Sequence, residues 1–240
     1  MAMNLQTLRT RSLTAAVFVI VMLGGLFWNQ WSFIALFTII HFGAWYEFVK
    51  LMKKIFPSKY IYYLPLGLFY ITMPVLMMLQ MGGRATIVHG TFVGEYGSGF
   101  KTEFSFGYSY IIPCTIIFSI WINDTMAYIV GSLIGKTPFS KISPKKTWEG
   151  TAGGAILCVI VISLIAYFSK LISVKDAVCI SAICAIFGTA GDLLESKIKR
   201  MANVKDSGSF MPGHGGFLDR FDSLLIAVPF VWLYLYVSGF

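Results

Sequence analysis

Seven apolar stretches set the strongest limit on what this chain can fold into. Each is close to the roughly 20 residues that a helix needs to cross the hydrocarbon core of a bilayer. Only 12% of the 240 residues are charged, whereas soluble domains average about 25%. Because a chain in lipid must satisfy its own backbone hydrogen bonds, the sequence predicts an all-α polytopic membrane bundle of about seven transmembrane helices. The stretches are Leu13–Trp28, Phe33–Val49, Tyr60–Met81, Tyr108–Val130, Gly150–Ser169, Ala177–Leu194 and Ser223–Val237.

Basic residues are distributed unevenly over the segments between these stretches. If the N-terminus is cytoplasmic, 15 of the 19 Lys and Arg residues fall on the cytoplasmic side, and the exceptions are Arg84, Lys101, Lys170 and Lys175. Cytoplasmic loops of membrane proteins carry such an excess. The sequence therefore predicts a cytoplasmic N-terminus. The net charge of +8 then reflects basic loops beside a membrane rather than a nucleic-acid-binding domain.

The chain divides into two regions of different composition. We predict N-terminal transmembrane helices and a loop over residues 1–107, and a catalytic membrane region over residues 108–240. Every Asp lies at or after Asp124, and carboxylates in or beside apolar spans are costly enough to mark functional sites. At the end of the first region, the Gly-rich segment Gly82–Gly107 predicts a non-cytoplasmic loop, with a short hairpin around FVGEYGSGF.

Polar residues gather where the sixth apolar stretch ends. Asp192, Glu195, Ser196 and Lys199 recur at helical spacing, so they share one face of a helix. This face is polar at the depth where the predicted bilayer ends. The pattern therefore places a carboxylate and a lysine at the cytoplasmic mouth of the bundle.

The loop and helix start that follow carry a second polar group. Gly215 and Gly216 follow His214, and glycines let backbone N–H groups approach a ligand closely, as phosphate-binding loops require. Asp219 and Asp222 stand three residues apart at the start of the last apolar helix, so they share a face. Both groups lie within about thirty residues of each other.

Together these residues suit chemistry on phosphates. Asp192, Asp219 and Asp222 could meet around one or two Mg²⁺ ions, which favour one or two carboxylates, retained waters and phosphate oxygens. Carboxylates, a metal and a cationic clamp fit phosphoryl or nucleotidyl transfer, where positioning and charge neutralisation supply most of the catalysis. The alternative interpretation is a set of solvated charges and helix caps beside the membrane. The surrounding cations are Lys197, Lys199, Arg200, Lys205 and Arg220.

An upstream segment supports the phosphate interpretation. Asn123 and Asp124 fall inside the fourth apolar stretch, where an Asp costs roughly 2.5–3.5 kcal/mol to insert and calls for a partner or a wet cavity. In the next loop, KISPKKTWEGTAGG, Lys145 and Lys146 can bind phosphates. Glu149 opens the following helix, whose N-terminus favours anions. From composition alone, a plain basic loop explains SPKK equally well.

These motifs resemble the phosphatidate cytidylyltransferase (CDP-diacylglycerol synthase) family. The family signature is similar to S-x-apolar-K-R, four residues, K-D-x-small, then P-x-H-G-G-apolar-x-D-R-apolar-D. Met211 stands where that pattern prefers Leu, Ile or Phe, and the INDT and SPKKTWEG stretches look like the family's upstream motifs. The signature is matched by Ser196, Lys199, Arg200, Lys205, Asp206, Gly208, Pro212, His214, Gly215, Gly216, Asp219, Arg220 and Asp222.

The resemblance implies a reaction in phospholipid biosynthesis. A cytidylyl group passes from CTP to phosphatidate with Mg²⁺ as cofactor, and the products are CDP-diacylglycerol and pyrophosphate. The lipid phosphate attacks the α-phosphorus in line. The implied catalytic residues are Asp192, Asp219, Asp222, Lys205 and Arg220, of which the three Asp are also the metal ligands. The implied substrate-binding residues are Asn123, Asp124, Lys145, Lys146, Glu149, Ser196, Lys199, Arg200, Asp206, His214, Gly215 and Gly216.

Other functions fit parts of the sequence. A CTP-dependent polyprenol or lipid kinase uses similar charges but releases CDP. A membrane transporter places its charges near the bilayer midplane, often in inverted repeats, whereas most acids here lie at predicted cytoplasmic ends. The D-G-x-x-A-R motif of CDP-alcohol phosphotransferases does not occur in the sequence.

The expected partners and location follow from the same interpretation. The partners are CTP, phosphatidate and the lipid bilayer, with no nucleic acid, and a homodimer is an open alternative. A basic start without a cleavage site or long transit segment favours a retained first span in a bacterial inner membrane, with the active site on the cytoplasmic side. The family usually has more apolar spans before the INDT-like motif, so the chain is either a compact member or lacks an upstream helix pair.

Overall fold

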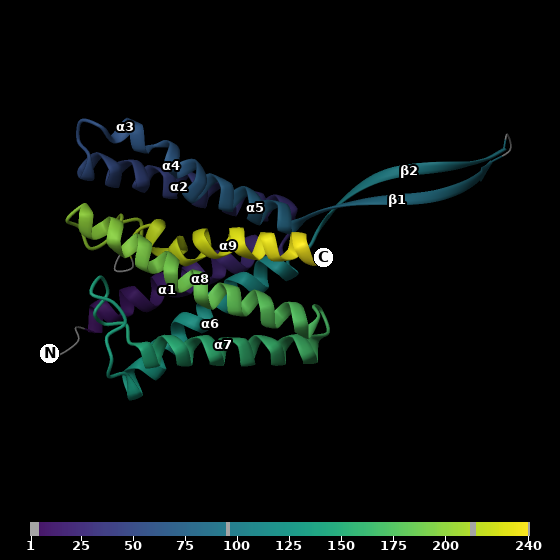
Figure 1. Cartoon of the computed structure of the whole chain (residues 1–240). Coiled ribbons are helices and arrows are strands. Elements are labelled where there is room, and N and C mark those ends of the chain that lie inside the picture. Colours follow the sequence, from purple (N-terminus) through teal and green to yellow (C-terminus); the bar gives the residue numbers. More distant parts are fainter. Residues whose placement is uncertain (1–4, 95–96, 212–214, 240) are drawn as a thin grey trace.

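The computed structural model describes residues 5–94, 97–211 and 215–239, with side chains described for 12–83, 107–211 and 215–239. It is a helical bundle with one long hairpin (Figure 1). The elements are α1 (Leu5–Phe27), α2 (Gln30–Ile55), α3 (Tyr60–Tyr63), α4 (Pro65–Gly67), the π-helical turn η1 (Leu68–Thr72), α5 (Met73–Gly82), β1 (Gly83–Gly94), β2 (Gly97–Tyr108), α6 (Ile111–Ile134), α7 (Trp148–Ser169), α8 (Val174–Met201) and α9 (Leu218–Ser238).

The predicted spans are confirmed as helices. Six helical stretches within the described residues are long and apolar enough to cross a membrane, and Ser12–Phe27 of α1 is a shorter apolar helix. The helices also expose large apolar side chains, such as Ile156, Ile160 and Leu164 on α7. In lipid these faces need no polar covering. The chain is therefore an all-α polytopic membrane protein.

The third predicted span is a broken helix. The stretch Tyr60–Gly82 runs as α3, α4, η1 and α5 in succession. Pro65 begins α4 and Pro74 lies in the first turn of α5, and a proline removes one backbone donor and crowds the preceding turn. At Gly67 a Cβ would lie 2.6 Å from the Trp45 ring, so the broken segment packs tightly against α2.

The ends of the helices sort into two groups (Figure 1). The start of α1, the α2–α3 connection, the α6–α7 loop and the α8–α9 loop all lie at one end of the bundle. The hairpin and the C-terminus lie at the other end. The first end carries most of the basic segments identified in the sequence, so the arrangement has the alternation on which the predicted orientation depends.

The main core draws on both halves of the chain. Phe37 and Ile40 of α2 belong to the same buried cluster as Ile117 of α6 and Val228 of α9. The helices α6, α7, α8 and α9 also pack in sequence order against one another. The predicted division between residues 107 and 108 stays a prediction, and the core crosses it.

The predicted short hairpin is confirmed and is longer than expected. β1 and β2 pair antiparallel from Gly83 opposite Tyr108 to Gly94 opposite Gly97. The hairpin projects beyond the bundle, at the end opposite the α8–α9 loop (Figure 1). Its base is fixed to the helices, because the Tyr108 hydroxyl donates to the Leu26 carbonyl at 2.5 Å.

Candidate active site

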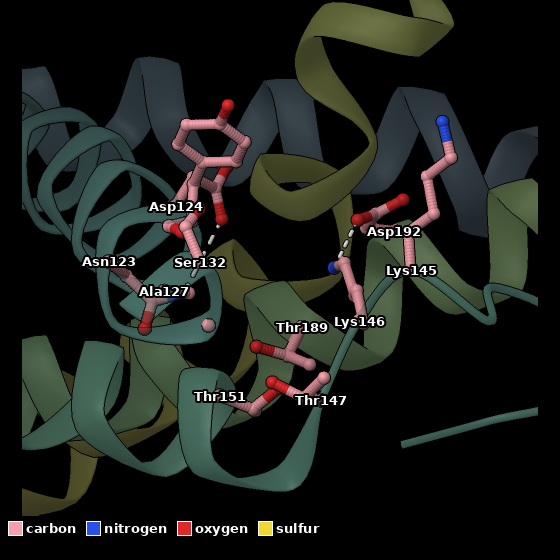
Figure 2. Close-up of a pocket in the computed structure, with 12 residues that line it drawn as sticks. Asn123, Asp124, Ala127, Ser132, Lys145, Lys146, Thr147, Thr151, Thr189 and Asp192 are labelled. Carbon is pink, nitrogen blue, oxygen red and sulfur yellow. Dashed lines mark hydrogen bonds and ion pairs between the residues drawn. The ribbon is translucent and has the colours of Figure 1, made fainter. Parts of the chain in front are cut away.

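A cavity of about 450 Å³ lies among α6, the α6–α7 loop, the start of α7 and α8 (Figure 2). Polar side chains from elements far apart in the sequence meet there. Asn123, Asp124, Lys145, Lys146 and Asp192 were all predicted as site residues, and the structure brings these five together. The lining consists of Asn123, Asp124, Ala127, Tyr128, Gly131, Ser132, Lys145, Lys146, Thr147, Thr151, Thr189 and Asp192.

Lys146 and Asp192 form the charged wall of the cavity. The Lys146 ammonium makes an ion pair with Asp192 Oδ2, shown as a dashed line in Figure 2. The Ser196 hydroxyl donates to Asp192 Oδ1 at 3.3 Å. The two charged side chains are 28% and 30% exposed, so both can still reach a ligand. Lys145 lines the same cavity, with its amino group extended away from this pair (Figure 2).

The opposite wall holds the buried side-chain amide of Asn123, which makes few hydrogen bonds to the described residues. Asn123 is 3% exposed, and its Nδ2 donates to Asp124 Oδ1 at a long 3.4 Å. Asn123 Oδ1 has no hydrogen-bond partner among the described residues. A buried polar atom without a partner is costly, so this oxygen marks a place where a ligand donor or water belongs.

Asp222 is a further carboxylate, outside the cavity lining, on the part of α9 that packs against the residue before Asp192. It is buried on the second turn of α9 and accepts a hydrogen bond from the Ser223 backbone N–H at 2.6 Å. The helices approach so closely that a Cβ at Gly191 would lie 2.5 Å from the Asp222 backbone oxygen. Close packing of α8 against α9 therefore holds Asp222 near Asp192.

The three Asp predicted to share a cation do not form one group. Within the part of the chain whose side chains are described, no cluster of three or more His, Cys, Asp or Glu side chains could hold a metal ion. Mg²⁺ needs only one or two carboxylates when phosphates and water complete its shell. Asp192 lines the cavity, and Asp222 lies where α9 packs against Gly191, the residue before Asp192, so these two carboxylates could hold such an ion.

Asp219 lies in a different environment. Its Oδ1 accepts from Lys199 Nζ at 2.6 Å. Its Oδ2 accepts from the backbone N–H groups of Ser207 and Gly216 at 2.8 and 2.7 Å, and lies 2.8 Å from the Ser207 hydroxyl. These protein donors already occupy the oxygens that a metal would need. Asp219 therefore ties the α8–α9 loop to α8 rather than facing the cavity.

The glycine loop also serves this internal contact. Gly215 has a φ of +84°, a conformation that glycine adopts at little cost. A Cβ there would lie 2.5 Å from Asp219 Oδ2. That Gly215 and Gly216 let the backbone approach a phosphate stays a prediction, and in this structure the close neighbour of this backbone is the Asp219 carboxylate. His214 lies outside the described residues.

The other predicted residues lie around the cavity rather than in it. Lys199 also pairs with Glu195 at 2.5 Å, and Arg200 donates to the Val204 carbonyl at 3.2 Å. Glu149 accepts from the backbone N–H groups of Lys136 and Thr137 and so braces the α6–α7 loop. Lys205, Asp206 and Arg220 are exposed at the same end of the bundle.

Sequence reasoning missed Glu47. This residue lies on α2, is 3% exposed, and accepts hydrogen bonds at the start of α9. A signal was available, because Glu47 falls inside the second apolar stretch, where an acid is as costly as Asp124 is in the fourth. Thr147, Thr151 and Thr189 in the cavity lining were missed too, since isolated threonines carry no pattern.

Comparison with known proteins places these motifs in a family. A model of the Cytidylyltransferase family matches residues 97–238, which include the whole cavity lining. The chain belongs to this family. Within it, the chain is 34% identical over 200 residues to the phosphatidate cytidylyltransferase of Staphylococcus aureus strain COL, covering 82% of this chain and 74% of that protein.

Two further relatives are more similar over shorter regions. The phosphatidate cytidylyltransferase of Bacillus subtilis is 41% identical over 132 residues, 54% of this chain and 48% of that protein. The protein of the same name from Staphylococcus haemolyticus is 42% identical over 142 residues, 57% of this chain and 54% of that protein. The chain thus spans about half the length of these two relatives. Glu47 lies outside the residues matched by the family model.

Proposed function

We propose that this protein is a phosphatidate cytidylyltransferase, which converts CTP and phosphatidate to CDP-diacylglycerol and pyrophosphate. The observation that carries the proposal is the Lys146–Asp192 cavity with its unpaired Asn123 oxygen. It is built from the family region and lies toward the basic end of a membrane bundle, where a soluble nucleotide and a lipid phosphate can meet. The names of the relatives supply the reaction.

The chemistry needs no side-chain nucleophile. A lipid phosphate oxygen forms the new bond to the α-phosphorus of CTP, and the bond from that phosphorus to the bridging oxygen of the β-phosphate breaks. The electron pair leaves with pyrophosphate. Lys145 and Lys146 line the cavity and bind the phosphates as cations, which lowers the repulsion between two anionic reactants.

Asp192 and Asp222 would hold the Mg²⁺ in this proposal. A bound Mg²⁺ ion supplies charge neutralisation for the reacting phosphates. Asn123 accepts a hydrogen bond from the cytidine base or an ordered water, since its buried Oδ1 has no donor among the residues that the structure describes. Arg220 stands on the first turn of α9, and it contacts the outer phosphates. Asp219 and Lys199 hold the α8–α9 loop, which leads into the helix that carries Arg220 and Asp222.

The membrane setting completes the proposal. The basic end of the bundle faces the cytoplasm of a bacterial inner membrane, so CTP arrives from the cytoplasm and phosphatidate from the lipid. Residues 108–240 form the catalytic region, and the helices of residues 1–107 pack against it and support it. Whether the protein is a monomer or a homodimer is to be measured by mass determination in detergent.

The test follows the label of CTP. The full chain is purified in detergent and mixed with phosphatidate, Mg²⁺ and CTP labelled at the α- or the γ-phosphate. We expect the α-label to enter the lipid and the γ-label to leave as pyrophosphate, and chelation of Mg²⁺ to stop both. Entry of the γ-label into lipid instead identifies a CTP-dependent lipid kinase. No transfer of either label by the folded protein contradicts both functions.

A further inference from the structure

A carboxylate from outside the family-matched region is buried against the signature loop. Glu47 of α2 is 3% exposed. Its oxygens accept from the backbone N–H groups of Phe217 and Leu218 at 3.0 and 2.9 Å, and from the Ser207 hydroxyl at 2.7 Å. Burying a carboxylate costs several kcal/mol unless donors surround it. The buried Glu47 carboxylate is therefore stable only because these donors surround it.

These donors matter because α9 does not cap itself. Its N-cap residue is Phe217, whose side chain makes no capping hydrogen bond. The first N–H groups of a helix need acceptors, and a carboxylate there also interacts favourably with the helix dipole. In most helices a nearby Ser, Thr, Asp or Asn provides this acceptor. Here Glu47 provides it from a helix 170 residues earlier in the chain.

The contact continues through Ser207 into the signature residues. The Ser207 hydroxyl lies 2.7 Å from Glu47 Oε2 and 2.8 Å from Asp219 Oδ2. Asp219 then binds Lys199 at 2.6 Å, and Lys199 binds Glu195 at 2.5 Å. We call these five residues the Glu47 network. It joins α2, the end of α8, the α8–α9 loop and the start of α9.

The loop is shaped to fit this carboxylate. At Gly216 a Cβ would lie 2.2 Å from Glu47 Oε1, and at Gly208 it would lie 2.1 Å from the same oxygen. Real side chains do not approach so closely, so any larger residue at either position displaces Glu47 or the loop. Two glycines of the signature segment are thus explained by a residue on α2.

We infer that Glu47 is a positioning residue for cytidylyl transfer, an inference that rests on the proposed function. Glu47 does not line the cavity. It fixes the first turn of α9, and the next turn carries Asp222, whose backbone packs against Gly191, the residue before Asp192 in the cavity wall. A shift of α9 therefore moves Asp222 relative to Asp192 while leaving the cavity residues themselves unchanged.

The test compares Glu47→Gln with a control that is destabilised elsewhere. Glutamine keeps the size of the side chain but loses the charge and one acceptor. Ile40→Val and Ile40→Ala lie two turns earlier on α2 at a buried position, and their cavities lower stability by graded amounts. The Ile40 variant whose melting temperature matches that of Glu47→Gln is the control. All proteins are full chains in the same detergent.

Two measurements separate positioning from general destabilisation. Amide hydrogen exchange of residues 205–219, without substrates, is expected to be at least about tenfold faster in Glu47→Gln and unchanged in the control. Turnover is expected to fall about 10–100-fold, and the Mg²⁺ concentration for half-maximal turnover to rise about tenfold, as for loss of a partner behind a ligand. The half-maximal concentration does not depend on the fraction of active protein.

Each outcome decides the inference. Equal exchange and equal kinetics in Glu47→Gln and the matched Ile40 variant overturn it. If Glu47→Gln does not fold, Ser207→Ala removes only the hydroxyl between the two carboxylates, and a rise in the same Mg²⁺ value is expected. Unchanged kinetics in a folded Ser207→Ala overturn the inference. An inactive wild-type protein contradicts the proposed function instead, and the exchange rates then show separately whether Glu47 holds α9.

Discussion

Asp192 and Asp219 were both predicted as metal ligands, but their surroundings in the structure are opposite. Asp219 receives hydrogen bonds from Lys199, Ser207 and Gly216. Among the described side chains, Asp192 has one partly exposed ion pair, to Lys146, and one long hydrogen bond, from Ser196. Protein donors already occupy the Asp219 carboxylate, whereas the Asp192 carboxylate keeps room for a ligand.

This difference separates two roles, ligand binding and holding a loop, which the sequence pattern alone does not distinguish. A carboxylate with several protein donors loses them if it binds a metal or phosphate-bound water, so it is suited to holding a loop. A carboxylate with few donors can bind a ligand without breaking the fold. We therefore assign the ligand-facing role to Asp192 and its neighbour Asp222, and the structural role to the Glu47 network around Asp219.

The largest expected effect comes from Asp192→Asn. We expect turnover to fall by about 10²–10³-fold, because one of the two carboxylates that would hold the charge-neutralising Mg²⁺ is lost. The melting temperature should change little, since Asp192 is 30% exposed and its ion pair is partly solvated. The measurement is α-label transfer from CTP to phosphatidate, together with a thermal melt.

The matched control is Asp176→Asn, at the opposite end of the same helix. Asp176 accepts from Ser173 and Tyr234, far from the cavity along α8. Its activity should stay within about twofold of wild type. Nearly normal turnover in Asp192→Asn would remove Asp192 from the site and end the contrast with Asp219.

Most of the fold could be predicted from the sequence. Hydropathy located the spans, because lipid allows only segments that satisfy their own backbone hydrogen bonds. The break in Tyr60–Gly82 and the length of the hairpin were not predicted. The first depends on local proline geometry and packing against Trp45, and the second on strand pairing over a Gly-rich segment with weak alternation.

The site could be predicted only in part. Patterns within one helix or loop found Asn123, Asp124, Lys146 and Asp192, which the fold brings to one cavity. The same patterns grouped Asp219 with Asp192, because spacing along the chain does not reveal which donors surround a side chain. Glu47 depends on contact between α2 and α9, and no local pattern connects residues so far apart.

An intermediate effect is expected from Gly216→Ala. The new methyl group would meet Glu47 Oε1 at 2.2 Å, so the loop or Glu47 must move, at a cost of about 1–3 kcal/mol. Thermal melts should show lower stability, with lower turnover because α9 shifts. In the double variant Glu47→Ala/Gly216→Ala the obstruction is gone, so the second substitution should cost almost nothing further. Additive losses in the double variant would show that Gly216 and Glu47 are not in contact.

The smallest expected effect is on the stability of Lys146→Met. The Lys146–Asp192 pair is partly exposed, with 28% and 30% of the side chains accessible, and such pairs contribute about 0–1 kcal/mol. The corresponding pair in the Glu47 network is more deeply buried, because Lys199 is 12% and Glu195 1% exposed. Removing Lys199 leaves the Glu195 and Asp219 carboxylates without their cation. Lys199→Met should therefore lower the melting temperature clearly more than Lys146→Met does. Lys146→Met should instead weaken CTP binding, seen as less thermal stabilisation by added CTP. Equal melting temperatures for the two lysine variants would mean that both carboxylate environments are solvated alike, and the division between a ligand-facing and a loop-holding carboxylate would not stand.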